Sequence, residues 1–83
     1  MKKEVQICID WLNRQKITKT INYDHTSYGL KHMVERWSDY YVSNEDFMDA
    51  VFFLKIKYRR ADGKNYYIAI SKKIIWSIIV KNA

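Results

Sequence analysis

The chain has 83 residues and a formal net charge of +6, with 48% hydrophobic and 16% aromatic residues. A chain of this length forms one domain that buries only about 60% of its unfolded surface, which argues against a large substrate cleft. Its hydrophobic content is too high for a disordered chain, and its longest apolar run near the C-terminus, IIWSIIV, is far shorter than the roughly 20 residues of a membrane span. We therefore expect a single globular domain over residues 1–83, with no transmembrane segment.

The cysteine content and the N-terminal sequence bear on the compartment. Cys8 is the only cysteine, so no internal disulfide can form. Asp10 and Asn13 interrupt the first apolar run, unlike the apolar region of a signal peptide. These features predict a cytoplasmic protein.

The N-terminal part of the chain predicts a helix and then a strand. Residues 3–15 carry apolar side chains at the spacing of one helical face, namely Val5, Cys8, Ile9 and Leu12, with Trp11 beside them. Residues 17–23 are rich in β-branched side chains. They alternate Ile17, Lys19, Ile21 and Tyr23 with Thr18, Thr20 and Asn22. This alternation predicts a short strand.

Two further helices are predicted. The first has Thr26 or Ser27 as its N-cap and an apolar face of Leu30, Met33, Val34 and Trp37. For the second, Ser43 stands three residues before Asp46, which predicts a capping box. Its expected buried face comprises Phe47, Ala50, Val51 and Leu54.

The dipeptide Asp62-Gly63 predicts the turn of a β-hairpin. A three-residue loop over 61–63, with Gly63 left-handed, keeps charged residues off the apolar face. This register gives two pairs, Ile56 with Ile68 and Tyr58 with Tyr66. Four side chains should then face outward together: Lys55, Lys57, Arg59 and Tyr67.

The C-terminal residues 71–81 fit either of two structures. Ile74, Ile75, Ile78 and Ile79 suit a helix, whereas Ile74, Trp76, Ile78 and Val80 suit a strand. We favour a helix capped by Ser71. The order of the elements predicts an α+β, winged-helix-like domain: three helices, a short antiparallel sheet and a C-terminal β-hairpin.

The basic residues gather around the hairpin. Residues 55–73 hold seven of the fifteen Lys and Arg residues and one acid, so their net charge of +6 equals that of the whole chain. Such a region could bind phosphates, with a tyrosine stacked on an unpaired base, or an acidic protein. Exposed strands also carry lysine to prevent edge pairing, so a solvated hairpin remains an alternative. The candidate binding residues are Lys55, Lys57, Arg59, Arg60, Lys64, Tyr67, Lys72 and Lys73.

The third predicted helix is poorly suited to reading DNA. Its first part carries Glu45, Asp46 and Asp49 and no basic residue, so the phosphate backbone would repel it. Asn44 is the one side chain there that could read a base. Met48, Phe52 and Phe53 lie outside the apolar face, either because the helix is buried on several sides or because Met48 and Phe52 contact a protein partner or a second copy of the chain. Met48, Asp49 and Phe52 are therefore candidate protein contacts.

Catalytic and cofactor-binding patterns are not apparent. His25, His32 and Cys8 lack the spacing of metal ligands, and Gly29 and Gly63 alone cannot build a phosphate-binding loop. The acids of the third helix are typical of a helix N-terminus. We expect neither an enzyme nor a bound cofactor.

Three stretches of the chain resemble small uncharacterised proteins of phages and other mobile elements. They are the Ser-Tyr-x-Leu-Lys-His run at 27–32, the Tyr-Val-Ser-Asn run at 41–44, and the basic strand at 55–60 with the Ile-Ser-Lys ending at 70–72. The similar proteins carry Gly-Ala where this chain has Glu45-Asp46. The resemblance covers about residues 25–73 and implies a mobile-element origin.

This origin suggests a function. Very small proteins of mobile elements often act stoichiometrically against host defences, as anti-CRISPR proteins do. The leading hypothesis is a non-catalytic inhibitor of a host defence nucleoprotein, specifically an anti-CRISPR protein, acting as a monomer or homodimer. The alternatives are a winged-helix-like protein or regulator that binds DNA or RNA through the hairpin, and a structural component whose basic face serves solubility.

Overall fold

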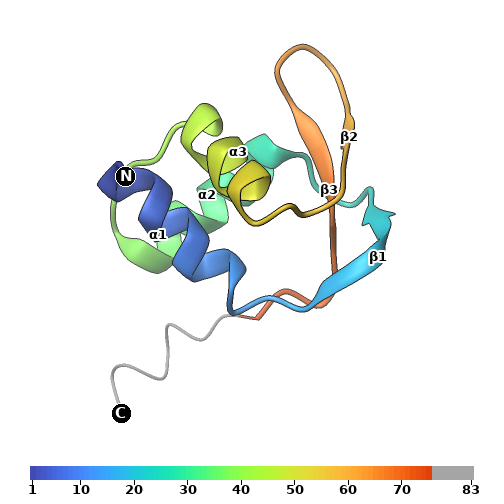
Figure 1. The fold of residues 1–83 in the computed structure, drawn as a ribbon, viewed down its shortest axis with the longest axis horizontal. Helices are drawn as coiled ribbons and strands as arrows, with labels where there is room; N and C mark the ends of the chain where they lie inside the picture. Colours follow the sequence, from blue (N-terminus) through green and yellow to red (C-terminus); the bar gives the residue numbers. More distant parts are fainter. Residues whose placement is uncertain (76–83) are drawn as a thin grey trace.

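The computed structural model describes residues 1–75 and has an α+β architecture (Figure 1). Its helices are α1 (Lys3–Leu12), α2 (Ser27–Ser38) and α3 (Asn44–Phe53). Its strands are β1 (Ile17–Asn22), β2 (Tyr58–Arg60) and β3 (Tyr66–Ile70), joined in one antiparallel sheet in the order β1-β3-β2. The predicted α+β class, with three helices and a short antiparallel sheet, is confirmed for these residues.

Helix α1 buries the apolar face predicted for it. Val5, Cys8, Ile9 and Leu12 all belong to the core. Trp11, expected only to flank this face, is fully buried, and its ring lies 6.2 Å from that of Phe47 in α3. Because apolar residues occupy more than one side of α1, the helix packs against both α3 and α2.

Helix α2 starts after Thr26, whose side chain makes no capping hydrogen bond. The alternative cap, Ser27, lies inside the helix, where its fully buried hydroxyl accepts a hydrogen bond from the Tyr66 N–H at 3.0 Å. This serine therefore connects the first turn of α2 to β3. The helix ends at Asp39, which has a left-handed backbone with φ of 66° and donates its N–H to the Glu35 carbonyl.

Helix α3 begins with the predicted capping box. The Ser43 hydroxyl accepts a hydrogen bond from the Asp46 N–H at 2.9 Å, and the Asp46 carboxylate accepts one from the Ser43 N–H at 3.1 Å. The helix ends in a Schellman motif. Lys55 is left-handed with φ of 58°, its N–H bonds to the Phe52 carbonyl, and the Ile56 N–H bonds to the Val51 carbonyl.

The hairpin register differs from the predicted one. The pairs are Tyr58 with Ile68, Arg59 with Tyr67, and Arg60 with Tyr66. Gly63 is left-handed as expected, but the loop comprises residues 62–64, since the Ala61 N–H bonds to the Asn65 carbonyl and the Asn65 N–H to that of Asp62. Ile56 cannot pair with Ile68 because it completes the Schellman motif of α3. Since the register moved by two residues, every side chain keeps its predicted face.

Strand β1 and the segment after β3 also depart from prediction. An irregularity between Ile17 and Asn22 interrupts the expected alternation, so that Ile17 is exposed and Asn22 is buried. The helix expected from Ser71 does not form over 71–75. There, the side-chain amide of Gln15 instead pairs with the backbone of Ile75, through bonds of 2.9 and 3.1 Å. The rest of that predicted helix, 76–81, lies outside the described residues.

The three helices lie on one side of the sheet, and the hairpin extends beyond them (Figure 1). The fully buried members of the core include Trp11, Leu12, Leu30, Val34, Val42, Phe47, Val51, Ile68 and Ile70. No helix within 1–75 has the length and apolar character needed to cross a membrane.

Candidate binding surfaces of the hairpin

The basic residues of the hairpin divide between two surfaces. Side chains alternate along a strand, so the consecutive residues Arg59 and Arg60 point to opposite faces of the sheet. Arg59 pairs with Tyr67 on the face away from the helices, whereas Arg60 pairs with Tyr66 on the face toward α3. The predicted single basic patch is therefore two surfaces, which we call the outer face and the helix-side groove.

The outer face combines cations with two tyrosines, Tyr67 in β3 and Tyr23 directly after β1. The Tyr23 and Tyr67 rings meet edge to face, with centroids 4.9 Å apart, and the Arg59 guanidinium donates a hydrogen bond to the Tyr23 hydroxyl at 3.3 Å. The Lys57 ammonium lies nearby and donates to the Lys19 carbonyl at 3.4 Å. An open hollow of about 480 Å³ lies beside Tyr23, bordered by the β1 and β2 segments; its lining is Thr20, Ile21, Tyr23, Lys57, Tyr58 and Arg59.

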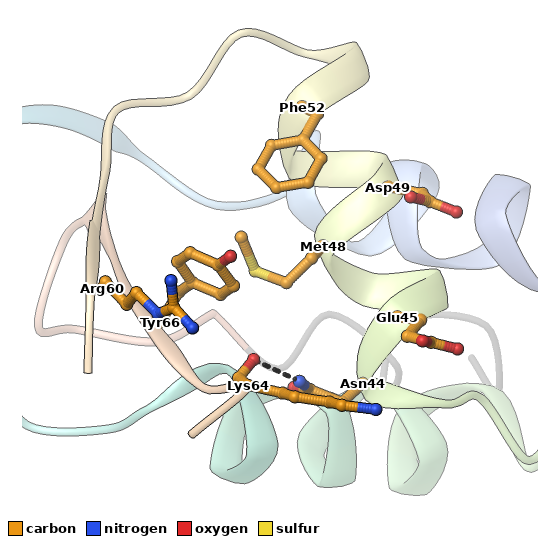
Figure 2. Close-up of a pocket in the computed structure, with 8 residues that line it drawn as sticks. All are labelled: Asn44, Glu45, Met48, Asp49, Phe52, Arg60, Lys64 and Tyr66. Carbon is orange, nitrogen blue, oxygen red and sulfur yellow. Dashed lines mark hydrogen bonds between the residues drawn. The ribbon is translucent and has the colours of Figure 1, made fainter. Parts of the chain in front are cut away.

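The helix-side groove is a pocket of about 210 Å³ between α3 and the hairpin (Figure 2). Met48, Phe52 and Tyr66 supply its apolar lining. Arg60 lies on the hairpin side, and Glu45 and Asp49 border the groove from α3, with their carboxylates pointing away from Arg60 in this view (Figure 2). Lys64 and Asn44 complete its lower end, where the Asn44 side chain donates a hydrogen bond to the Lys64 carbonyl at 2.9 Å.

An aromatic cluster forms the upper part of this groove. The Phe52 ring packs edge to face on Tyr58 and Tyr66, at centroid distances of 5.1 and 6.2 Å, and the two tyrosines lie 5.6 Å apart. These contacts fix the orientation of Phe52 although 43% of it remains exposed. The groove thus exposes to solvent an aromatic ring whose orientation is fixed by packing.

The three candidate protein contacts in α3 have different roles. Asp49 and Phe52 are exposed and border the groove, as a protein contact requires. Met48 is only 3% exposed, so it is part of the floor and not a projecting anchor. The side of α3 outside the predicted apolar face is therefore buried at Met48 and exposed at Asp49 and Phe52.

Of the remaining basic candidates, Lys55 and Lys73 line neither surface. Lys55 occupies the turn after α3 and borders a separate hollow with Asn13 and Ile17. Lys72 reaches to 3.8 Å from the Asp24 carboxylate, next to Tyr23 in the chain, so it borders the outer face. Lys73 is exposed, and its backbone N–H bonds to the Ser71 hydroxyl.

The acids at the start of α3 are not equivalent. Asp46 is buried and receives hydrogen bonds from Lys2 and Ser43. Burial alone would raise the pKa of Asp46, but these bonds outweigh it and hold the pKa below its ordinary value. Glu45 and Asp49 are exposed and make no ion pair within residues 1–75. Only these two are available to a partner.

His32 and Cys8, two of the residues considered as metal ligands, take part in the packing of the fold. His32 Nδ1 lies 2.9 Å from the Glu35 carboxylate, which also accepts bonds from Lys31 and the Val42 N–H. Burial raises the pKa of Cys8 to about 12, with a smaller contribution from nearby carboxylates, so the thiol stays protonated. In the described part of the chain, no three His, Cys, Asp or Glu side chains are grouped as metal ligands.

Sequence reasoning did not include Tyr23 among the binding residues, and it treated Asn44 only as a base reader. Tyr23 joins Arg59 and Tyr67 only because β1 lies beside β3, a neighbour relation that the linear sequence does not reveal. Its position in the alternating run 17–23 was the one available signal. Comparison with known proteins adds no relative, since no family model, no curated protein and no solved structure matches this chain.

Proposed function

We propose that this chain is a non-catalytic binding protein that inhibits a host defence nucleoprotein by docking on it, specifically an anti-CRISPR protein. The docking surface is the helix-side groove. The mobile-element origin implied by the sequence resemblance supports the inhibitory role, and the make-up of the groove supports a protein partner.

The main support for this proposal is that the groove combines apolar side chains with charged side chains of both signs. An apolar floor, a held and half-exposed Phe52, and charges of both signs at its edges match the composition of protein interfaces, where aromatic anchors are surrounded by a polar rim. A phosphate backbone would be attracted by Arg60 but repelled by Glu45 and Asp49. A protein surface can satisfy both signs at once.

We further infer a winged-helix-like arrangement. The element order α1-β1-α2-α3-β2-β3 and the strand order β1-β3-β2 support it. In winged-helix DNA readers, the third helix enters the major groove with its N-terminal residues. Here that end of α3 exposes Glu45 and Asp49, which disfavours duplex reading through α3. The arrangement therefore supports a scaffold for protein docking in preference to a duplex reader.

A direct binding experiment tests the proposal. Purified effector complexes from several CRISPR types are immobilised, and binding of the wild-type protein is measured by biolayer interferometry. We expect at least one complex to bind it. Phe52→Ala should weaken that binding by about 2 kcal/mol or more, roughly 30-fold, as truncation of an interface anchor does.

The neighbouring Phe53 provides the matched control. It is 60% exposed, more than Phe52, but does not line the groove. Phe53→Ala should leave the affinity within about twofold. Binding to none of the complexes would refute the inhibitory role, and equal losses for both phenylalanine variants would refute the groove as the docking surface.

A further inference from the structure

The outer face of the sheet is uncovered. The three helices pack on the opposite side (Figure 1), and Tyr23 and Arg59 are exposed while Tyr67 is partly buried. A small protein normally exposes tyrosines singly, but here two of them are in contact on an open surface. Strand alternation directs Arg59 and Tyr67 away from the helix-side groove, and Tyr58 borders both surfaces.

Tyr23 is held as a preformed stacking surface. Tyr67 supports its ring edge-on, and Arg59 binds its hydroxyl at 3.3 Å, yet 53% of Tyr23 stays exposed. A ring fixed before binding loses little conformational entropy when a ligand stacks on it. Aromatic rings on open sheet surfaces bind unpaired bases in this way, because every base offers a π face.

Two cations, Lys57 and Arg59, lie near this ring. Within the described part of the chain, Lys57 and Arg59 form no ion pair with a carboxylate. The nearest acid, Asp24, is engaged by Lys72 at 3.8 Å. The hollow beside Tyr23 is open and is bordered by both Lys57 and Arg59. Phosphates entering the hollow would therefore meet positive charge while a base reaches the ring.

We propose that the outer face binds single-stranded nucleic acid, with Tyr23 as the stacking residue and Lys57 and Arg59 as phosphate contacts. Paired bases are stacked inside a duplex and cannot reach Tyr23, so single strands are the preferred ligand. This inference goes beyond the protein docking proposed for the groove. It assigns the opposite face of the same hairpin a second ligand.

The experiment measures fluorescence anisotropy of a labelled oligothymidylate, the oligouridylate of equal length and a duplex, across a salt series. Single strands should bind more tightly than duplex, with log affinity falling by about 0.7 per phosphate contact for each unit of log salt. Tyr23→Ala should weaken single-strand binding by roughly 5- to 150-fold, the loss typical of one stacked base. Comparison of the two oligonucleotides distinguishes DNA from RNA.

Two matched variants test the face. Arg60→Ala removes the same charge as Arg59→Ala from the neighbouring residue, but from the groove. Tyr40→Ala removes a tyrosine of similar exposure, 51%, that packs beside Lys3 at the start of α1 and lines neither surface. We expect Arg59→Ala to lower both affinity and salt slope, and both controls to bind like the wild type. Circular dichroism verifies that each variant is folded.

The outcomes that would overturn the inference are equally specific. They are tighter binding of duplex than of single strands, equal losses for Arg59→Ala and Arg60→Ala, or wild-type binding by Tyr23→Ala. The first two results would indicate non-specific attraction between the basic hairpin and phosphates. The third would show that Tyr23 is not a stacking residue. Because the groove test uses Phe52 and Phe53, failure of either proposal leaves the other measurable.

Discussion

The side chains of Lys2 and Asp46 meet at 2.8 Å and connect the start of α1 to the start of α3. The Asp46 carboxylate also completes the capping box with Ser43. Helix α3, which lines the groove, is thus fixed to the start of α1 at one buried acid.

Removal of this acid should destabilise the protein mainly through the cap. Asp46→Ala should lower the free energy of unfolding by about 1–2 kcal/mol, and Ser43→Ala by about 1 kcal/mol. Lys2→Met should cost less than either of these because Lys2 is largely exposed and its ion pair is screened by water. Urea denaturation of the three variants checks the order. A larger loss for Lys2→Met than for Ser43→Ala would contradict it.

The same carboxylate should make stability depend on acidity. The Asp46 pKa is lowered in the folded protein, with burial opposed and outweighed by hydrogen bonds, and Glu35 is lowered in the same way by bonds from Lys31, His32 and the Val42 N–H. A lowered folded pKa contributes stability above the unfolded pKa, near 4, and this contribution is lost as pH falls through the folded value. Stability should therefore decrease from about pH 5 downward.

A double substitution checks this pH dependence. Thermal unfolding of Asp46→Asn/Glu35→Gln should show a shallower decrease with acidification than the wild type. Glu45→Gln, which changes an exposed acid in the same turn as Asp46, is the control and should follow the wild-type curve more closely. An unchanged slope in the double variant would contradict the assignment.

A glycine in the turn after α3 should stabilise the protein. Lys55 adopts a left-handed backbone, which is strained by about 1 kcal/mol for a residue with a Cβ. Lys55→Gly should raise the free energy of unfolding by roughly 0.5–1 kcal/mol. Lys57→Gly is a matched control, since Lys57 is also exposed but precedes β2 and needs no left-handed backbone; it should be neutral or destabilising. A gain from both substitutions would contradict the turn geometry.

The helices could be predicted from the sequence because their signals are local. The capping box of Ser43 and Asp46, and the apolar spacing from Val5 to Leu12, depend only on residues within a few turns. The hairpin was harder. Its turn was recognised from Asp62-Gly63, but its register depended on Ile56 being held by the end of α3, a competition between helix capping and strand pairing.

The binding surfaces could be predicted only in part. The basic residues were identified by their density, yet their division between Arg59 and Arg60 followed only from strand alternation combined with the side on which the helices pack. The pairing of Tyr23 with Tyr67 depended on strand order. Charge counting cannot distinguish one patch from two, because it carries no information about faces.

Cys8 should be unreactive in the folded protein. Its pKa of about 12 and full burial keep it protonated and inaccessible. We expect negligible reaction with Ellman's reagent at neutral pH, and complete reaction of one thiol after unfolding in guanidinium chloride. Rapid labelling of the native protein would contradict the burial of the α1 face.

Ser27 should be essential to the junction of α2 and β3. Its buried hydroxyl accepts the Tyr66 N–H, so Ser27→Ala leaves that N–H without a partner and should cost about 1–3 kcal/mol in urea denaturation. Ser38→Ala changes a serine at the other end of the same helix, whose bonds are exposed, and should cost less than about 0.5 kcal/mol. Similar losses of stability in Ser27→Ala and Ser38→Ala would contradict the role of Ser27 in joining α2 to β3.

The most direct test of the proposed inhibitory function is a plasmid-interference assay in bacteria. Strains carrying different CRISPR effectors receive a targeted plasmid together with the wild-type protein, Phe52→Ala or Phe53→Ala. We predict that the wild type and Phe53→Ala restore transformation in at least one strain and that Phe52→Ala does not. The account would be contradicted if the wild-type protein left plasmid interference undiminished in every strain.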